Sequence, residues 1–260
     1  EGIDENGEIE YFTAAMWFWG SENSTIQYCE IAGQKNVGDG MAVDFDSHSN
    51  NCTYQYIYSH DNVRFMCNCP NYSGQYGNTV RYCLSVNDNK GRSTTAVGAC
   101  GEHNFSFYNN TIINCGEFQF KNLYNAFIAN NIIIPVDGAT FAYDVDASRE
   151  NVFENNCYYD VMTPLVDLGA MNTVPGFSGT DYSDVNSFKL SASSPLIGAG
   201  SEINIDRDFY GNPIESNNIG CYGGKGTDTE YKGENIIEKI IRTLGDIIET
   251  LVHEIVVIFD

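Results

Sequence analysis

The feature that most constrains the fold is an internal repeat with a period in the twenties. Six similar segments follow one another, at spacings of 28, 26, 27, 21 and 25 residues. In each copy, β-branched and aromatic residues flank a polar bend. This is typical of a solenoid of short strands, each stacking on the same strand of the next coil. The equivalent positions are Cys29, Ile57, Cys83, Asn110, Asn131 and Asn156.

A second series of six segments predicts one wall of this solenoid, a parallel sheet with about 4.8 Å between coils. Side chains alternate along a strand, so Val43 and Phe45 can enter the core while Asp44 and Asp46 stay outside. The chain is rich in Tyr, Phe, Asn, Gly and Ser, so we expect an all-β fold with little helix. The segments of this series begin at Ala14, Ala42, Val63, Thr95, Glu117 and Thr140.

The chain is strongly acidic, with a formal net charge of -22. A field of this sign repels polyanions, so we expect neither a nucleic acid nor an anionic membrane as partner. The nine cysteines are an odd number and are scattered along the chain, so no disulfide framework is evident. No export signal is visible from Glu1 onward, and we expect one to have been removed or to lie outside this sequence.

Aromatic and acidic residues coincide on the predicted wall. Trp17 and Trp19 precede Asp44 and Asp46 by 27 residues each, which is close to one period. An exposed indole offers a flat apolar face to a sugar ring, and a neighbouring carboxylate can bind hydroxyl groups or enter the reaction. The alternative is that a further coil or another chain covers both tryptophans. The same outer face is predicted to continue with Arg64, Met66 and Asn68, then Glu117, Gln119 and Lys121.

Among these residues, Arg64, Glu117 and Lys121 are candidate substrate contacts, although Glu117 and Lys121 also fit a solvated surface. The bend "SHDN" adds His60, which can act as a general acid or base near neutral pH or serve only as a partner within the turn.

Carboxylates recur at the bends of the predicted coils. Asp39, Asp61 and Asp88 occupy comparable bends of successive coils. Stacked carboxylates repel one another unless water, hydrogen bonds or a hard cation intervenes. These three residues therefore predict a calcium site.

The motifs "DGMAVDFDSHSNNCTYQYIYSHDN" and "FYNNTIIN", with the closing "FKLSASSPLIGAGSEINIDRDFYGNPIESNNIGCYGG", resemble the right-handed parallel β-helix proteins of the pectate-lyase-like superfamily. Within it, the chain is similar to secreted bacterial members grouped with polysaccharide-degrading enzymes. The similarity covers roughly residues 10 to 224. Relatives usually begin with several more coils and carry a Gly-rich stretch after "SHDN", where this chain has "VRFMCNC". The resemblance implies a protein that acts on polysaccharide at the cell surface or outside the cell.

Three functions fit this set of residues. In hydrolysis, Asp44 and Asp46 supply the paired carboxyl groups, with His60 assisting and the tryptophans as sugar platforms. In β-elimination, a base such as His60, Lys121 or Arg64 removes a proton beside a uronate that calcium has neutralised. In the third function, the wall binds glycan without chemistry, as in an adhesin. The acidic field favours hydrolysis of a neutral or weakly charged glycan.

The pattern changes after the repeats. Residues 1–222 are predicted to form the β-helix, 223–235 a polar linker and 236–260 an amphipathic helix. Charged residues interrupt the apolar positions of this helix, so we do not expect it to span a membrane. It can cap the open end of the solenoid or join chains into a homo-oligomer.

Overall fold

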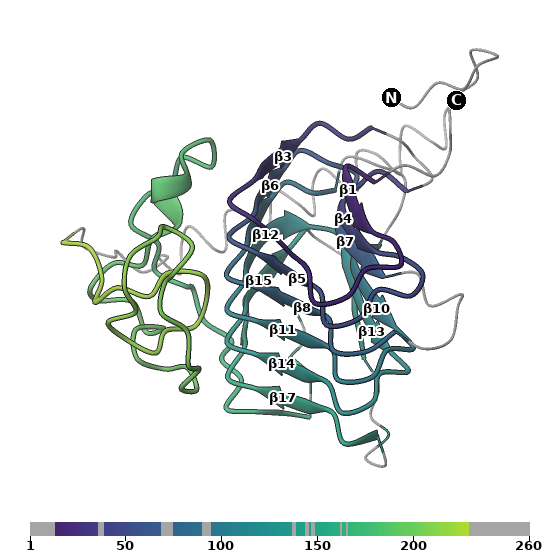
Figure 1. Cartoon of the computed structure of the whole chain (residues 1–260). Helices are drawn as coiled ribbons and strands as arrows, with labels where there is room; N and C mark the ends of the chain where they lie inside the picture. The colour runs from purple at the N-terminus through teal and green to yellow at the C-terminus, as the bar shows by residue number, and fades with distance from the viewer. Residues whose placement is uncertain are drawn as a thin grey trace, which may run out of the picture.

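Short parallel strands stack into three sheets that together form a β-solenoid (Figure 1). The computed structural model describes residues 14–35, 39–68, 75–89, 95–136, 139–143, 146, 149–161, 163–164 and 166–228. Within these residues the fold is all-β. Its helical structure is limited to short turns such as the 3-10 helix η2 (Val185–Phe188). The predicted parallel β-helix is confirmed. The predicted helix 236–260 lies outside the described residues.

Each of six coils contributes one strand to each sheet, and sheet 2 has a seventh strand, β19. Sheet 1 contains β1 (Met16–Phe18), β4 (Met41–Phe45), β7 (Arg64–Asn68), β10 (Thr95–Cys100), β13 (Glu117–Lys121) and β16 (Phe141–Tyr143). Sheet 2 contains β2 (Thr25–Gln27), β5 (Thr53–Gln55), β8 (Thr79–Arg81), β11 (Ser106–Tyr108), β14 (Phe127–Ala129), β17 (Val152–Glu154) and β19 (Asp167–Leu168). Sheet 3 contains β3 (Glu30–Ala32), β6 (Tyr58–His60), β9 (Leu84–Val86), β12 (Thr111–Cys115), β15 (Ile132–Pro135) and β18 (Cys157–Tyr158).

The register of sheet 2 reproduces the repeat seen in the sequence. Its first residues pair from coil to coil at spacings of 28, 26, 27, 21 and 25 residues, the same series as in the sequence. The equivalence of the six copies is therefore confirmed. The paired residues are Thr25, Thr53, Thr79, Ser106, Phe127 and Val152.

The corners need a left-handed backbone conformation, which explains the abundance of asparagine. A residue with positive φ follows each strand of sheet 2 in the six coils, and Asn tolerates this conformation better than most residues. In the first three coils tyrosines take this position, and Tyr28 stacks on Tyr56 with ring centroids 5.0 Å apart. The six corner residues are Tyr28, Tyr56, Tyr82, Asn109, Asn130 and Asn155.

The next position faces inward, and in the last three coils it holds a ladder of buried asparagines, Asn110, Asn131 and Asn156. The backbone N–H of Asn110 donates to Asn131 Oδ1 at 3.0 Å, and that of Asn131 donates to Asn156 Oδ1 at 2.9 Å. The ladder ends on Asp167, whose Oδ2 accepts from Asn156 Nδ2 at 2.7 Å. A buried polar group is costly unless it is hydrogen-bonded, and here each amide satisfies groups of two coils.

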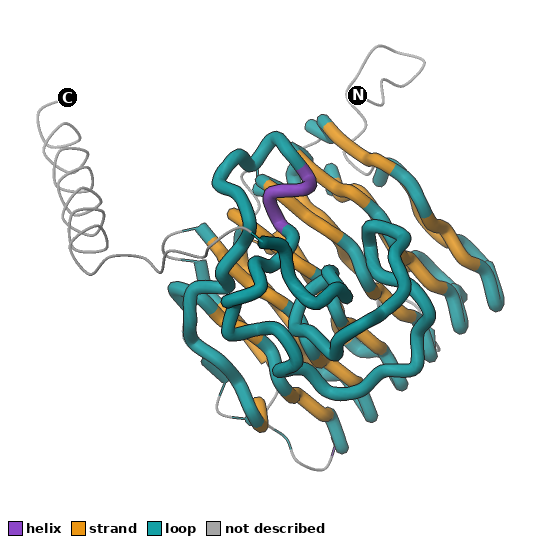
Figure 2. Tube along the Cα trace, turned by 90° about the vertical axis from the view of Figure 1, so that its left-hand side faces the viewer, coloured by secondary structure: helices purple, strands orange, loops and turns teal. Residues whose placement is uncertain are grey.

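A lobe of irregular structure, residues 172–228, covers the outer face of sheet 3 (Figures 1 and 2). Outward residues of sheet 3 such as Leu84 and Ile132 form one apolar cluster with Leu196 and Ile219 of the lobe. The strands of the solenoid end at Leu168, and the lobe includes residues 223–228, the start of the predicted linker. Of the described helical segments, none has the length and apolar character needed to cross a bilayer.

Candidate functional site

Trp17 and Asp44 are neighbours on the outer face of sheet 1. Parallel pairing of β1 with β4 places Trp17 opposite Asp44 and Phe18 opposite Phe45. Because both phenylalanines belong to the core, alternation along the strands turns Trp17 and Asp44 outward together. The prediction that indole and carboxylate share one wall is confirmed.

These side chains differ in their access to water. Trp17 is 54% exposed and Trp19, directly after β1, is 61% exposed, whereas Asp44 is only 5% exposed. Asp46 lies in the turn after β4, where its Oδ1 accepts hydrogen bonds from the backbone N (2.6 Å) and Oγ (3.2 Å) of Ser47. Two exposed indoles therefore accompany one nearly buried carboxyl group and one carboxylate that also accepts hydrogen bonds within a turn. The prediction that Asp44 faces the solvent is wrong.

The rest of the outward column differs from the prediction. Asp44 pairs with Cys67, whereas Arg64 pairs with Met41 and Met66 with Val43. Arg64, Met66 and Asn68 thus alternate with the outward Cys67, and the prediction that they share the outer face with Asp44 is wrong. The step from Asp44 to its partner Cys67 is an odd number of residues, whereas the predicted Arg64, Met66 and Asn68 lie an even number of residues after Asp44. An error of one residue in register moves a strand's side chains to the opposite face.

Further along sheet 1, the outward residues are those expected. Glu117, Gln119 and Lys121 alternate with Phe118 and Phe120, which lie in the core. Gln119 continues the column of Asp44 and Cys67 through Gly98.

Asp39 precedes β4 and interacts electrostatically with two other candidate residues. Burial raises the pKa of its carboxyl group, Arg64 lowers this pKa, and Asp46 raises it. Asp46 and Arg64 are therefore both within electrostatic range of Asp39.

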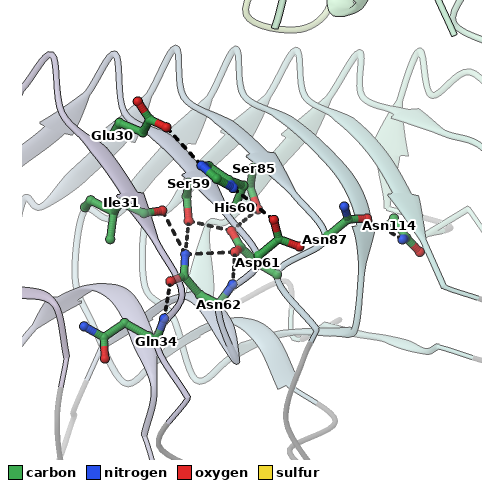
Figure 3. Close-up of polar contacts among 11 residues, drawn as sticks. Glu30, Ile31, Gln34, Ser59, His60, Asp61, Asn62, Ser85, Asn87 and Asn114 are labelled. Atoms are coloured by element: carbon green, nitrogen blue, oxygen red, sulfur yellow. Dashed lines mark hydrogen bonds and ion pairs between the residues drawn. The ribbon is translucent and has the colours of Figure 1, made fainter. Parts of the chain in front are cut away.

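His60 is the last residue of β6 and lies on sheet 3, so the structure does not place it on the wall of Asp44. Its Nε2 is 3.1 Å from Glu30 Oε1 and its Nδ1 is 3.0 Å from Asp61 Oδ2 (Figure 3). Its ring stacks on Tyr58, with centroids 4.5 Å apart. The role of Glu30 was missed. Because Ala32 pairs with His60 and Glu30 with Tyr58, Glu30 is the diagonal neighbour of His60 across two coils, a relation visible only once the register is known.

The two carboxylates favour the charged imidazolium. Burial lowers the pKa of His60, but the hydrogen bonds and charges of Asp61 and Glu30 outweigh it, so the pKa is raised above its ordinary 6.5. The resulting stabilisation is complete below the unfolded-state pKa and disappears as the pH rises through the higher folded-state pKa. The cluster of Glu30, His60 and Asp61 thus stabilises the contact between the first and second coils most at mildly acidic pH.

Replacing His60 by Gln should therefore lower the unfolding temperature more at pH 5.5 than at pH 8.5. The loss in free energy of unfolding should stay below about 1 kcal/mol, because Glu30 is largely exposed and water weakens its ion pair with His60. Thermal unfolding of both proteins at the two pH values measures this. An equal loss at both pH values contradicts the ion-pair explanation.

The three residues predicted to bind calcium take different places. Asp61 has positive φ at the corner, and the pairing of His60 with Val86 makes Asn87, not Asp88, its equivalent. Asp88 is fully buried and matches Asn62, whose backbone N and Nδ2 both donate to Asp88 Oδ1 at 3.0 Å. Its Oδ2 accepts from the hydroxyls of two serines, which Figure 3 shows converging from neighbouring coils: Ser59 at 2.5 Å and Ser85 at 2.6 Å.

Hydrogen-bond donors of the protein itself thus surround the carboxyl group of Asp88. In the part of the chain that the structure describes, no cluster of three or more His, Cys, Asp or Glu residues could hold a metal ion.

The wall of sheet 1 and the His60 cluster are thus two separate surfaces, each built by the pairing of the first two coils. Comparison with known proteins adds no family to this picture, because no protein-family model matches the chain and no curated protein matches it either.

Proposed function

We propose that this protein binds a polysaccharide on the outer face of sheet 1 and acts outside the cell. The observation that carries the proposal is the register of Trp17 with Asp44, which sets an exposed indole beside a carboxyl group. The resemblance of the repeats to right-handed β-helix proteins of the pectate-lyase-like superfamily supports the same class of ligand.

The chemistry of the pair suits a sugar ring. An indole face packs against the axial hydrogens of the ring, and a carboxylate beside it accepts hydrogen bonds from hydroxyl groups. Because Trp17 and Trp19 are both more than half exposed, their rings remain accessible to a ligand. The parallel strands add one outward residue about every 4.8 Å, which suits an elongated chain that contacts several coils.

Hydrolysis at the same wall is the second candidate function. It is favoured by the placement of Asp44, a carboxyl group nearly removed from water beside the exposed indole. Paired carboxyl groups are the usual apparatus of glycoside hydrolysis, and Asp46 lies two residues further along. The carboxylate of Asp46 holds the Ser47 turn, and His60 lies on sheet 3, so we rank binding first.

Replacing Trp17 by Ala should weaken binding of a polysaccharide ligand at least tenfold, the effect of losing about 1.4 kcal/mol of stacking energy. Isothermal titration with a panel of neutral, amino and acidic oligosaccharides measures this. Tyr182→Ala, which removes an exposed aromatic ring from the lobe, is the matched control and should leave affinity unchanged.

Binding that survives the loss of both Trp17 and Trp19 would place the ligand elsewhere and refute the proposal. Product analysis of the same mixtures decides between the two candidates. New reducing ends that disappear in Asp44→Asn establish hydrolysis, and binding without products establishes a binding wall.

A further inference from the structure

One corner of the solenoid carries a sequence motif that the proposed function leaves unused. The tripeptide Asn-x-Ser/Thr is the acceptor sequence for N-linked glycans. A chain rich in asparagine contains this tripeptide by composition alone, so the structural setting of each copy decides whether it can carry a glycan. The motif begins at Asn23, Asn51, Asn71, Asn104 and Asn109, of which Asn71 lies outside the described residues.

Three of these motifs stack in register at the corner that precedes sheet 2. Parallel bridges join the residue before each acceptor asparagine from coil to coil, through Tyr76 in the coil between. The hydroxyl residues two positions after the asparagines begin β2, β5 and β11 and belong to one column of sheet 2. The three stacked motifs are residues 23–25, 51–53 and 104–106.

The acceptor side chains at this corner are accessible and uncommitted. Within the described residues, Nδ2 of each asparagine donates no hydrogen bond, and each hydroxyl group two positions later makes none. Oδ1 of Asn104 accepts from Asn125 Nδ2 at 2.7 Å, which leaves Nδ2 of Asn104 available. The exposed asparagines are Asn23, Asn51 and Asn104, and the exposed or half-buried hydroxyl residues are Thr25, Thr53 and Ser106.

The lobe closes the motif at Asn109. This asparagine is 3% exposed, and its Nδ2 donates to Asn218 O at 3.0 Å and to Gly220 O at 3.1 Å. The hydroxyl of Thr111 accepts from Cys221 N at 3.0 Å. A glycan on Asn109 Nδ2 would occupy the place of the lobe, so the folded chain cannot carry one there.

We infer that this corner is a site of N-linked glycosylation, with a glycan on Asn104 and another on either Asn23 or Asn51. Neighbouring coils are about 4.8 Å apart, so glycans on both Asn23 and Asn51 of one molecule would crowd each other. Asn104 lies two coils beyond Asn51, because Gly77 takes the equivalent place in the coil between. The inference goes beyond the proposed function and shares with it only the export of the chain.

The co-substrate is a polyprenyl-diphosphate-linked oligosaccharide, which a membrane-bound transferase offers to the chain during export. The asparagine Nδ2 attacks the anomeric carbon of the sugar. A C–N bond forms as the C–O bond to the diphosphate breaks, polyprenyl diphosphate leaves with the electron pair, and the amide nitrogen gives up one proton. Transfer precedes folding, so the fold then determines which modified chains become soluble protein.

The test is secretion of the full chain from a cell line that performs N-glycosylation. Enzymatic release of the glycans in water enriched in heavy oxygen labels each former site, and peptide mass spectrometry locates the label. Label should appear at Asn104 and at Asn23 or Asn51, and not at Asn109. Ser106→Ala should remove it from Asn104 alone. Thr79→Ala, in the same column but outside any motif, is the matched control and should leave every label unchanged.

Three results would overturn the inference: label at Asn109 in the soluble protein, absence of label from Asn104 or from both Asn23 and Asn51, and label at Asn104 that survives Ser106→Ala. Thermal unfolding of the secreted protein establishes that it is folded. Translation into isolated microsomes gives the same readout at the corner without secretion. Polysaccharide binding by Trp17 enters none of these measurements, so the proposed function is decided separately.

Discussion

Replacing Asn131 by Ala should cost about 4 kcal/mol of stability, because several buried groups lose their partners at once. The side chain of Asn131 accepts from the backbone and side chain of Asn110, and its Nδ2 donates to Phe107 O and to Asn156 Oδ1. Alanine leaves the buried Phe107 carbonyl and Asn110 N–H without these partners, and it also opens a cavity.

Denaturant unfolding followed by circular dichroism measures this loss. Asn172→Ala is the matched control, since Asn172 is exposed and its Nδ2 donates to Val161 O at 3.3 Å. Its loss should stay below about 1 kcal/mol. Asn131→Asp has nearly the same volume but cannot donate to Phe107 O, so it should destabilise as well. If both Asn131 variants match the control, the ladder does not stabilise the solenoid as we infer.

The wild-type protein should be less stable at pH 7.5 than at pH 5, and Glu102 should be a main cause. Burial raises the pKa of this carboxyl group from 4.5 to about 7, although Asn68 Nδ2 and the backbone N–H of Asn78 donate to it and lower the pKa. The folded state therefore keeps a proton that the unfolded chain has already lost. Its stabilising contribution is complete below pH 4.5 and is lost as the pH rises through about 7.

At 1.36 kcal/mol per pKa unit, this shift corresponds to about 3 kcal/mol between the two limits. Glu102→Gln stays neutral throughout, so its stability should vary much less between pH 5 and pH 7.5. Denaturant unfolding at both pH values compares the slopes, with the exposed Glu202→Gln as control. Burial also raises the pKa of Asp167 and Asp208, so some dependence should remain in all three proteins. Identical slopes in wild type and Glu102→Gln would refute this assignment.

The sequence was sufficient for the fold because stacking imposes a local pattern at every coil. Inward positions such as Tyr54 and Val80 must be apolar, and the corners must accept positive φ or donate to the next coil. The position shared by Asn110, Asn131 and Asn156 therefore shows the period directly. Coil length was the part of the pattern that varied.

The site was harder to predict because it depends on register between unequal coils. The 27-residue step from Trp17 to Asp44 preserved the predicted pairing, whereas the 23-residue step to Cys67 displaced Arg64 from the outer face. His60 and Glu30 meet on a diagonal across coils, which no linear spacing rule indicates. The hydrogen-bond donors to Asp88 are two serines and an asparagine from two adjacent coils. Each of these residues, considered alone, is a common turn residue and does not indicate a shared cluster.

The lobe makes the resistance of the solenoid to local unfolding differ along its axis. Asn109 Nδ2 donates to Asn218 O, and Gly220 N donates to Asn130 O, so the lobe joins the coil of β11 to the coil of β14. A stack of nearest-neighbour units ordinarily frays inward from either end. These bonds couple the two coils, whereas among the described strands those of the first coil, β1, β2 and β3, have partners on one side only. The indole of Trp17 therefore belongs to an end coil of the described solenoid, which should open at lower cost than the coils joined by the lobe, and a ligand bridging the first two coils would stabilise this end.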